Sequence, residues 1–185
     1  FIVSSTHGAS GFEKFFLGSN TFKIITATTR PVFTIRDTIS PKNISNIILP
    51  LDTSHDTRQK VPFTAEIASY CNAKIHVVSV CQTLNKEFEK KLNGYSKQTC
   101  EYLYKQNIPY ETDFRSGQNI TDLTLEYAQE VGADLISIMT EQSVAFSGVV
   151  IGGNAQEILN KSDFPVLSNT PKELSIKGNF RTQGY

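Results

Sequence analysis

The sequence has no excess of charge of either sign. Eighteen lysines and arginines are balanced by eighteen aspartates and glutamates, so the formal net charge at pH 7 is zero. Proteins that hold nucleic acid or an anionic membrane through their overall field carry a basic excess. We therefore expect neither nucleic acid nor a membrane as a partner.

Cysteine is scarce and long apolar runs are missing. Cys71, Cys81 and Cys100 are odd in number, far apart and without Cys-x-x-Cys spacing, which argues against a disulfide framework and against a zinc site. This usage fits a reducing cytoplasm, with Cys81 as an inert buried thiol. No run reaches the roughly 18 to 20 apolar residues of a spanning helix, and no signal-peptide pattern is visible.

Sequence patterns of enzymes are also missing. The chain shows no Ser-His-Asp or Cys-His order, no paired carboxylates with a shared pocket and no cluster with metal-ligand spacing. We predict no catalytic residue and no metal ligand, and we favour a binding role over an enzymatic one. His76, inside an apolar run, is expected to be a core or surface histidine and not a ligand.

One stretch near the start combines an apolar strand, glycines and a helix start. Residues 1–5 are short, apolar and β-branched, as in a buried strand. A helix is predicted over residues 20–26, beginning near Gly18 with Ser19 as its cap. Gly8 and Gly18 would leave main-chain N–H groups unobstructed beside a positive helix end. This order suits a phosphate, although most glycine pairs in loops only make turns.

The remaining chain alternates strands and helices. Residues 31–36 form a second strand, and the polar residues 37–43 form a linker. Further strands are predicted at 44–52, 73–81, 109–115, 134–140 and 165–168, with helices at 56–71, 84–106, 119–131 and up to residue 161. Such alternation predicts an α/β fold with an open, doubly wound, five-stranded parallel sheet.

An internal repeat relates the two ends of the chain. A shift of 134 positions without a gap superposes eight identical residues in 36, among them Gly18 on Gly152 and Asn20 on Asn154. We therefore expect residues 1–36 to be the back half of a first unit. Residues 44–170 would form a complete second unit and 171–185 a tail. The natural chain would then start before Phe1 and contain two such units in tandem.

These residues resemble the universal stress protein family. Its nucleotide-binding members carry Gly-x2-Gly-x9-Gly-Ser/Thr after the fourth strand. Here STHG at residues 5–8 is followed by nine residues and then Gly18-Ser19, with Ser5 in place of the first glycine. In the second unit ILPLD, HVVSV, GADLISIMT and FPVL resemble the family's first, second, fourth and fifth strands. The resemblance covers residues 1–36 and about 45–170.

The resemblance implies an adenine nucleotide α-hydrolase-like fold, often dimeric through its last strands, that holds ATP or a related adenine nucleotide, with or without Mg. Adenine would lie at the first two strand ends and the phosphates on the glycine loop. The implied nucleotide-binding residues are Gly8, Gly18, Ser19 and Asn20 in the first unit and Pro50, Asp52, Val80, Gly152 and Gly153 in the second. An equally open interpretation makes Asp52 only a turn or capping acid.

The second unit departs from the family pattern on the phosphate side. Residues 139–142 stand where the glycines would be, and Gly153 replaces the serine. Glu141 would place a carboxylate where a triphosphate would lie, and like charges repel at short range. We therefore expect the second unit to be degenerate for ATP.

Three functions stay open. The first is an ATP-responsive stress or signalling module. The second is a structural interaction module without nucleotide, in which residues 32–36 and 166–170 pair as a homodimer or an intramolecular pseudo-dimer. The third is a weak ATP hydrolase.

Overall fold

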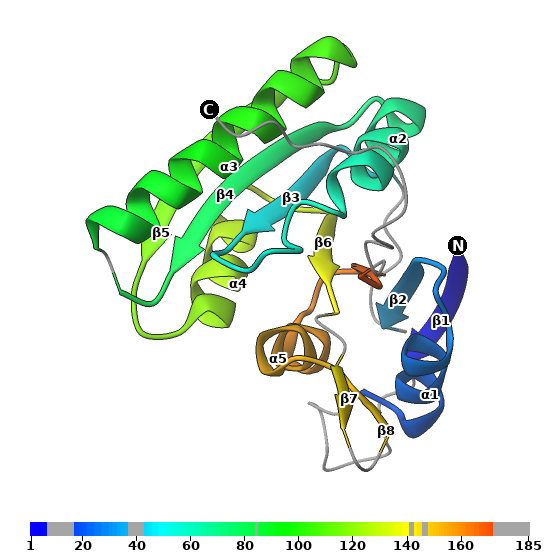
Figure 1. The fold of residues 1–185 in the computed structure, drawn as a ribbon. Coiled ribbons are helices and arrows are strands. Elements are labelled where there is room, and N and C mark those ends of the chain that lie inside the picture. Colours follow the sequence, from blue (N-terminus) through cyan, green and yellow to red (C-terminus); the bar gives the residue numbers. More distant parts are fainter. Residues whose placement is uncertain (7–16, 37–42, 84, 141–142, 146–147, 172–185) are drawn as a thin grey trace, which may run out of the picture.

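The computed structural model describes residues 1–6, 17–36, 43–83, 85–140, 143–145 and 148–171. Strands and helices alternate along them (Figure 1). The elements are β1 (Ile2–Thr6), α1 (Ser19–Ala27), β2 (Val32–Arg36), β3 (Asn46–Leu51), α2 (Val61–Cys71), β4 (Lys74–Cys81), α3 (Lys86–Lys105), β5 (Tyr110–Ser116), α4 (Ile120–Glu130), β6 (Leu135–Met139), β7 (Ser143–Ala145), β8 (Gly148–Val150), α5 (Gly153–Lys161) and β9 (Val166–Asn169). Gly8 and Glu141 lie outside the described residues, as do most of the predicted linker and tail.

Seven strands form one sheet in the order β1-β2-β9-β6-β3-β4-β5. The five strands from β9 to β5 are mutually parallel, which confirms the predicted α/β class. The sheet is wider than the predicted five strands because β1 and β2, from the start of the chain, extend it beyond β9.

Helices cover both faces of the sheet because its central strands are apolar on both sides. β3 and β4 are buried almost throughout, as parallel strands between two helical layers are. On one face, Ile48 belongs to the core that includes Ile25 of α1 and Ile158 of α5. On the other face, Leu49 belongs to the core that includes Ala65 of α2. Alternate residues of one strand therefore serve two separate cores.

The two halves of the internal repeat meet where β2 pairs antiparallel with β9. The paired residues are Val32 with Ser168, Phe33 with Leu167 and Thr34 with Val166. Phe33 and Leu167 are 134 positions apart, the offset of the sequence repeat. Thr34 Oγ1 donates to the Val166 carbonyl (3.2 Å), and Ser168 Oγ donates to the Val32 carbonyl (3.1 Å). The two hydrogen bonds are equivalent, because the repeat offset of 134 relates Thr34 to Ser168 and Val32 to Val166. The pairing of β2 with β9 therefore has local two-fold symmetry.

Several predicted boundaries are confirmed and others shift. Pro62 lies in the first turn of α2, which starts at Val61 and not at residue 56, because proline is tolerated only where the helix has no N–H partner to lose. Asn119 caps α4, and Gly132 follows its end with φ +62°. The region expected to be a loop after β6 contains the hairpin β7–β8, a result of β-branched valines within a short segment.

The buried histidine His76 lies in β4. It is 3% exposed, its Nε2 lies 3.1 Å from Asn46 Oδ1, and its Nδ1 lies 3.6 Å from Glu111 Oε2. Desolvation lowers the pKa of His76 below the ordinary 6.5, against the opposing effect of Glu111. Of the two positions expected from the sequence, core and surface, His76 takes the core one.

We expect His76 to make the protein less stable in mild acid. The folded state has the lower pKa, so it binds fewer protons than the unfolded state, and stability falls as the pH drops below about 6.5. Melting temperatures measured between pH 7.5 and 5.5 should fall less steeply for His76→Gln than for the unchanged protein. The exposed His55 is the control, and equal slopes for the His76→Gln and His55→Gln variants would contradict this expectation.

Candidate functional site

The carboxyl ends of β3, β4 and β6 meet the start of α5 around one small cavity of about 30 Å³. It is lined by Pro50, Asp52, Lys60, Val80, Ile120, Thr124, Ile138, Met139, Asn154, Ala155 and Ile158. The chain order of the strands reverses between β3 and β6, and open α/β sheets bind ligands at this switch point. The structure thus brings together Pro50, Asp52 and Val80, three of the residues expected on the adenine and ribose side.

Asp52 follows β3. It has features of both roles considered for it, a ligand contact and a turn-forming acid. It lines the cavity, and its Oδ1 accepts a hydrogen bond from Ser54 N (2.8 Å), the pattern of an aspartate that shapes its own turn. Its backbone N donates to Thr57 Oγ1 (3.1 Å). Asp52 is therefore a turn residue at the cavity edge, and a role in ligand binding stays a prediction.

Lys60 is a cavity residue that the sequence did not single out. It is only 2% exposed, and its Nζ donates to the Thr57 carbonyl (2.6 Å) and approaches Thr57 Oγ1 (3.3 Å). Lysine is rarely buried this far. The sequence feature that could have pointed to Lys60 is its position directly before Val61-Pro62. The proline makes these the first helical residues and leaves Lys60 at the edge where the strands end.

The size of the cavity limits what it holds in this conformation. Small-molecule sites commonly measure about 300 to 1,000 Å³, whereas 30 Å³ is room for about one water molecule. Most of the wall is apolar and includes Ile120 of α4, Ile158 of α5 and Val80 of β4. The arrangement has the position of a nucleotide site without its volume.

The helices α1 and α5 begin in the same way. Gly18 and Gly152 are the residues before the first helical turn, with φ −54° and −58°, and among the described residues no side chain caps either helix. The expectation that Ser19 caps α1 is therefore wrong: Ser19 is already the first helical residue, so its side chain lies past the capping position. Uncapped N–H groups at a positive helix end suit an anion.

Among the described residues, nothing requires a glycine at position 18 or at position 153. The backbone angles of Gly18 are open to any residue. A Cβ built on Gly18 or on Gly153 meets no atom within 4 Å. Asn20 follows as an exposed residue of α1. Leu17 N donates to Asn160 Oδ1 (2.7 Å), which ties the start of α1 to α5.

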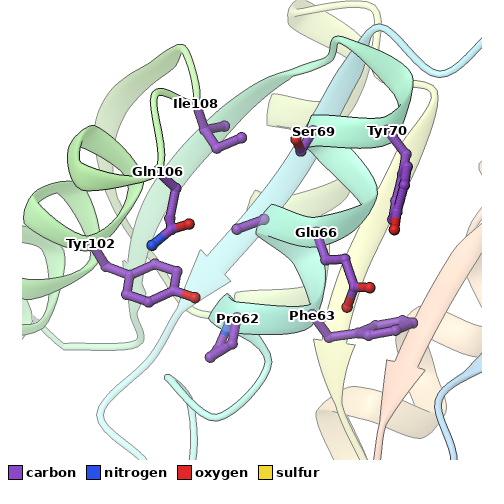
Figure 2. Close-up of a pocket in the computed structure, with 9 residues that line it drawn as sticks. Pro62, Phe63, Glu66, Ser69, Tyr70, Tyr102, Gln106 and Ile108 are labelled. Atoms are coloured by element: carbon purple, nitrogen blue, oxygen red, sulfur yellow. The ribbon is translucent and has the colours of Figure 1, made fainter.

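A larger groove of about 590 Å³ lies between α2 and α3. Figure 2 shows Tyr102 and Gln106 on one side of it and Pro62 and Ser69 of α2 on the other. None of its lining residues is a predicted site residue, and none belongs to the strands that meet at the switch point. We therefore take the smaller cavity as the candidate site.

The next features are the side chains that could bind a metal ion or react as thiols. In the described ranges, no three His, Cys, Asp or Glu side chains lie close enough to hold a metal ion. Cys81 is buried, and burial raises its pKa, as expected for an unreactive thiol. Over the same ranges, no helix is long and apolar enough to cross a bilayer.

Comparisons with known proteins match this architecture. Residues 43–168 match the model of the universal stress protein family. A search of curated proteins gives no match. A universal stress protein from Archaeoglobus fulgidus superposes with a TM-score of 0.73 at 16% identity, over 92% of this chain and 62% of that one. A putative universal stress protein from Pseudomonas aeruginosa gives 0.68 at 19%, over 92% and 63%.

The chain thus spans less than two thirds of the length of these two structures. A shorter universal stress protein from Archaeoglobus fulgidus, solved in complex with dAMP, superposes with a TM-score of 0.56 at 19% identity, over 70% of this chain and 98% of that one. At identities this low, the superpositions establish the shared fold and nothing beyond it.

Proposed function

The chain belongs to the universal stress protein family, and from this premise we propose that it is a nucleotide-responsive binding module with two units in tandem. Residues 1–36 are the back half of the first unit, 37–43 the linker, 44–170 the complete second unit and 171–185 a tail. In this proposal an adenine nucleotide binds to the first unit, and the second unit is a closed copy.

The structural repeat supports the tandem arrangement. α1 and α5 begin and end at positions exactly one repeat offset of 134 apart. The antiparallel pairing of β2 with β9 joins the two copies within one chain. The similarity to the longer structures extends over 92% of the chain, beyond the family match at residues 43–168. We propose that this pairing is a pseudo-dimer, which leaves the β9 edge unavailable for a homodimer.

The repeated helix start is the observation that carries the nucleotide proposal. Glycine precedes the uncapped first turn of both α1 and α5, where backbone N–H groups and the helix dipole favour phosphate. A relative of this fold binds dAMP. We assign the phosphates to Gly8, Gly18, Ser19 and Asn20, and we propose ATP or a related adenine nucleotide, with or without Mg, as the ligand.

The second unit is proposed to be closed because its cavity is too small for a base. Pro50, Asp52 and Val80 line about 30 Å³, far below the size of a nucleotide site. A ligand on the first unit acts by favouring one of two conformations, and it does so only through a difference in affinity between them. The β2–β9 pairing is the contact through which such a change reaches the second unit.

Titration calorimetry of ATP and AMP against the intact tandem protein tests this function, because residues 1–36 are only the back half of the proposed first unit. We expect saturable binding with one site per chain, and at least tenfold weaker binding for Gly18→Val, because a valine side chain stands in front of the N–H groups. Since a Cβ at Gly18 meets no protein atom within 4 Å, the substitution should leave the fold intact. Gly94→Val, in α3 and equally open, is the matched control.

Two results of that titration would count against the function. The absence of heat and saturation at millimolar nucleotide would remove the nucleotide proposal. It would leave the structural interaction module, which the β2–β9 pairing favours independently. Binding that is equally weak in the Gly18→Val and Gly94→Val variants would instead show that the nucleotide lies elsewhere.

A further inference from the structure

A buried lysine lines the cavity at the switch point, and we propose that the Lys60 side chain closes this cavity to a nucleoside by taking up the space that the nucleoside needs. This inference rests on the proposed function in one respect, since it takes the cavity as the second unit's nucleotide position. It goes further by naming the residue that makes the second unit degenerate.

The ammonium group lies between the cavity and the turn that follows β3. Lys60 lines the cavity, while its Nζ donates to the Thr57 carbonyl at 2.6 Å. Thr57 is itself 1% exposed, and its Oγ1 accepts from Asp52 N at 3.1 Å. Thr57 therefore holds both the Lys60 ammonium group and the Asp52 backbone at the edge of the cavity.

The backbone of Lys60 is held as firmly as its tip. Thr64 Oγ1 donates to the Lys60 carbonyl (2.8 Å) and lies 2.7 Å from Ser137 Oγ of β6. Asn169 Nδ2 of β9 in turn donates to Ser137 Oγ (3.4 Å). Thr64 and Ser137 are fully buried, and buried hydrogen bonds of this kind are costly to break. These bonds hold the start of α2 in place, so loss of the lysine side chain is the change at this wall that enlarges the cavity.

The residues that line the cavity indicate which ligand the Lys60 side chain would exclude. Pro50, Val80 and Ile138 give the cavity an apolar wall, against which the methylene stem of a lysine packs. Burying an ammonium group is unfavourable unless hydrogen bonds compensate, and Thr57 supplies them. An apolar wall with one carboxylate at its edge is also suited to a nucleoside, with the base on the wall and a ribose hydroxyl on Asp52. The stem and the nucleoside compete for the same space.

Nucleoside binding by truncated variants tests the inference, with adenosine and AMP as probes and backbone amide NMR shifts as the readout. In the unchanged protein the amides of Asp52 and Val80 should not shift up to millimolar adenosine. Lys60→Ala should shift both amides saturably, with at least a tenfold gain in affinity. Lys60→Met fills the same space without charge and should stay closed. Lys74→Ala, a partly exposed lysine in β4, is the control.

Lys60→Ser is a second truncation in case the alanine variant does not fold, since its hydroxyl can still reach the turn. A folded Lys60→Ala or Lys60→Ser variant without shifts at Asp52 and Val80 would overturn the inference. Equal binding by Lys60→Met would overturn it too, because then bulk is not what closes the cavity. Failure of the proposed function has a different signature: no response to ATP at the amides of Gly18 and Ser19 in the unchanged protein.

Discussion

Replacing Ile136 by alanine is expected to lower the free energy of unfolding by about 3 to 4 kcal/mol. Ile136 is fully buried in β6, paired with Ile48 of β3 on one side and Val166 of β9 on the other. Neighbours on both sides prevent the site from collapsing around the lost atoms. Urea denaturation of both proteins measures the difference.

The matched control for this change is Ile2→Ala. Ile2 is the repeat equivalent of Ile136, since the two isoleucines are 134 positions apart. It lies in β1, at the edge of the sheet and half-buried, and pairs only with Val32. We expect a cost of about 1 kcal/mol there, because part of the side chain is already in water. Similar costs at the two positions would mean that β6 is not the central strand described.

Phe33→Ala is expected to cost about 3 kcal/mol and to loosen the opening segment selectively. Phe33 is 9% exposed, belongs to the core on the α2 face and pairs with Leu167. Its removal takes away a large buried side chain where the two repeat halves meet. Hydrogen exchange should become faster in β1 and β2 and stay slow in β3 and β4.

Phe1→Ala is the control for this substitution. The Phe1 ring packs edge-on against Phe33 at 5.2 Å between centroids, yet its residue is 68% exposed. We expect a change below about 1 kcal/mol, because little apolar area leaves water at that position. If Phe33→Ala accelerated exchange in β3 and β4 as much as in β1 and β2, the two halves would unfold as one unit.

The strand and helix order was predictable because it follows from local patterns. The continuous apolar run at β4 predicts a strand buried on both faces. Asn119 and Gly132 mark the ends of α4 through capping and left-handed backbone, which act within one helical turn. The hairpin β7–β8 was missed because its strands are three residues each, too short for a period to show.

The candidate site was predictable in part. Pro50, Asp52 and Val80 follow from the rule that the ends of parallel strands share one edge, and they do line one cavity. Lys60 was not predictable, because a lysine next to a helix start is usually solvated. Its burial depends on Thr57, Thr64 and the facing strand β6, contacts that no local pattern encodes.

By itself, the sequence determined the family, the alternation of strands and helices and the repeat that relates residues 1–36 to 135–170, since these depend on residue order and periodicity. Only the tertiary structure decided that β2 and β9 join the two repeat segments in one sheet and that the cavity at the switch point measures only about 30 Å³. The physical reason is that strand pairing and packing volume are set by contacts between segments far apart in the sequence, more than a hundred positions for β2 and β9, whose distances exist only in the folded chain.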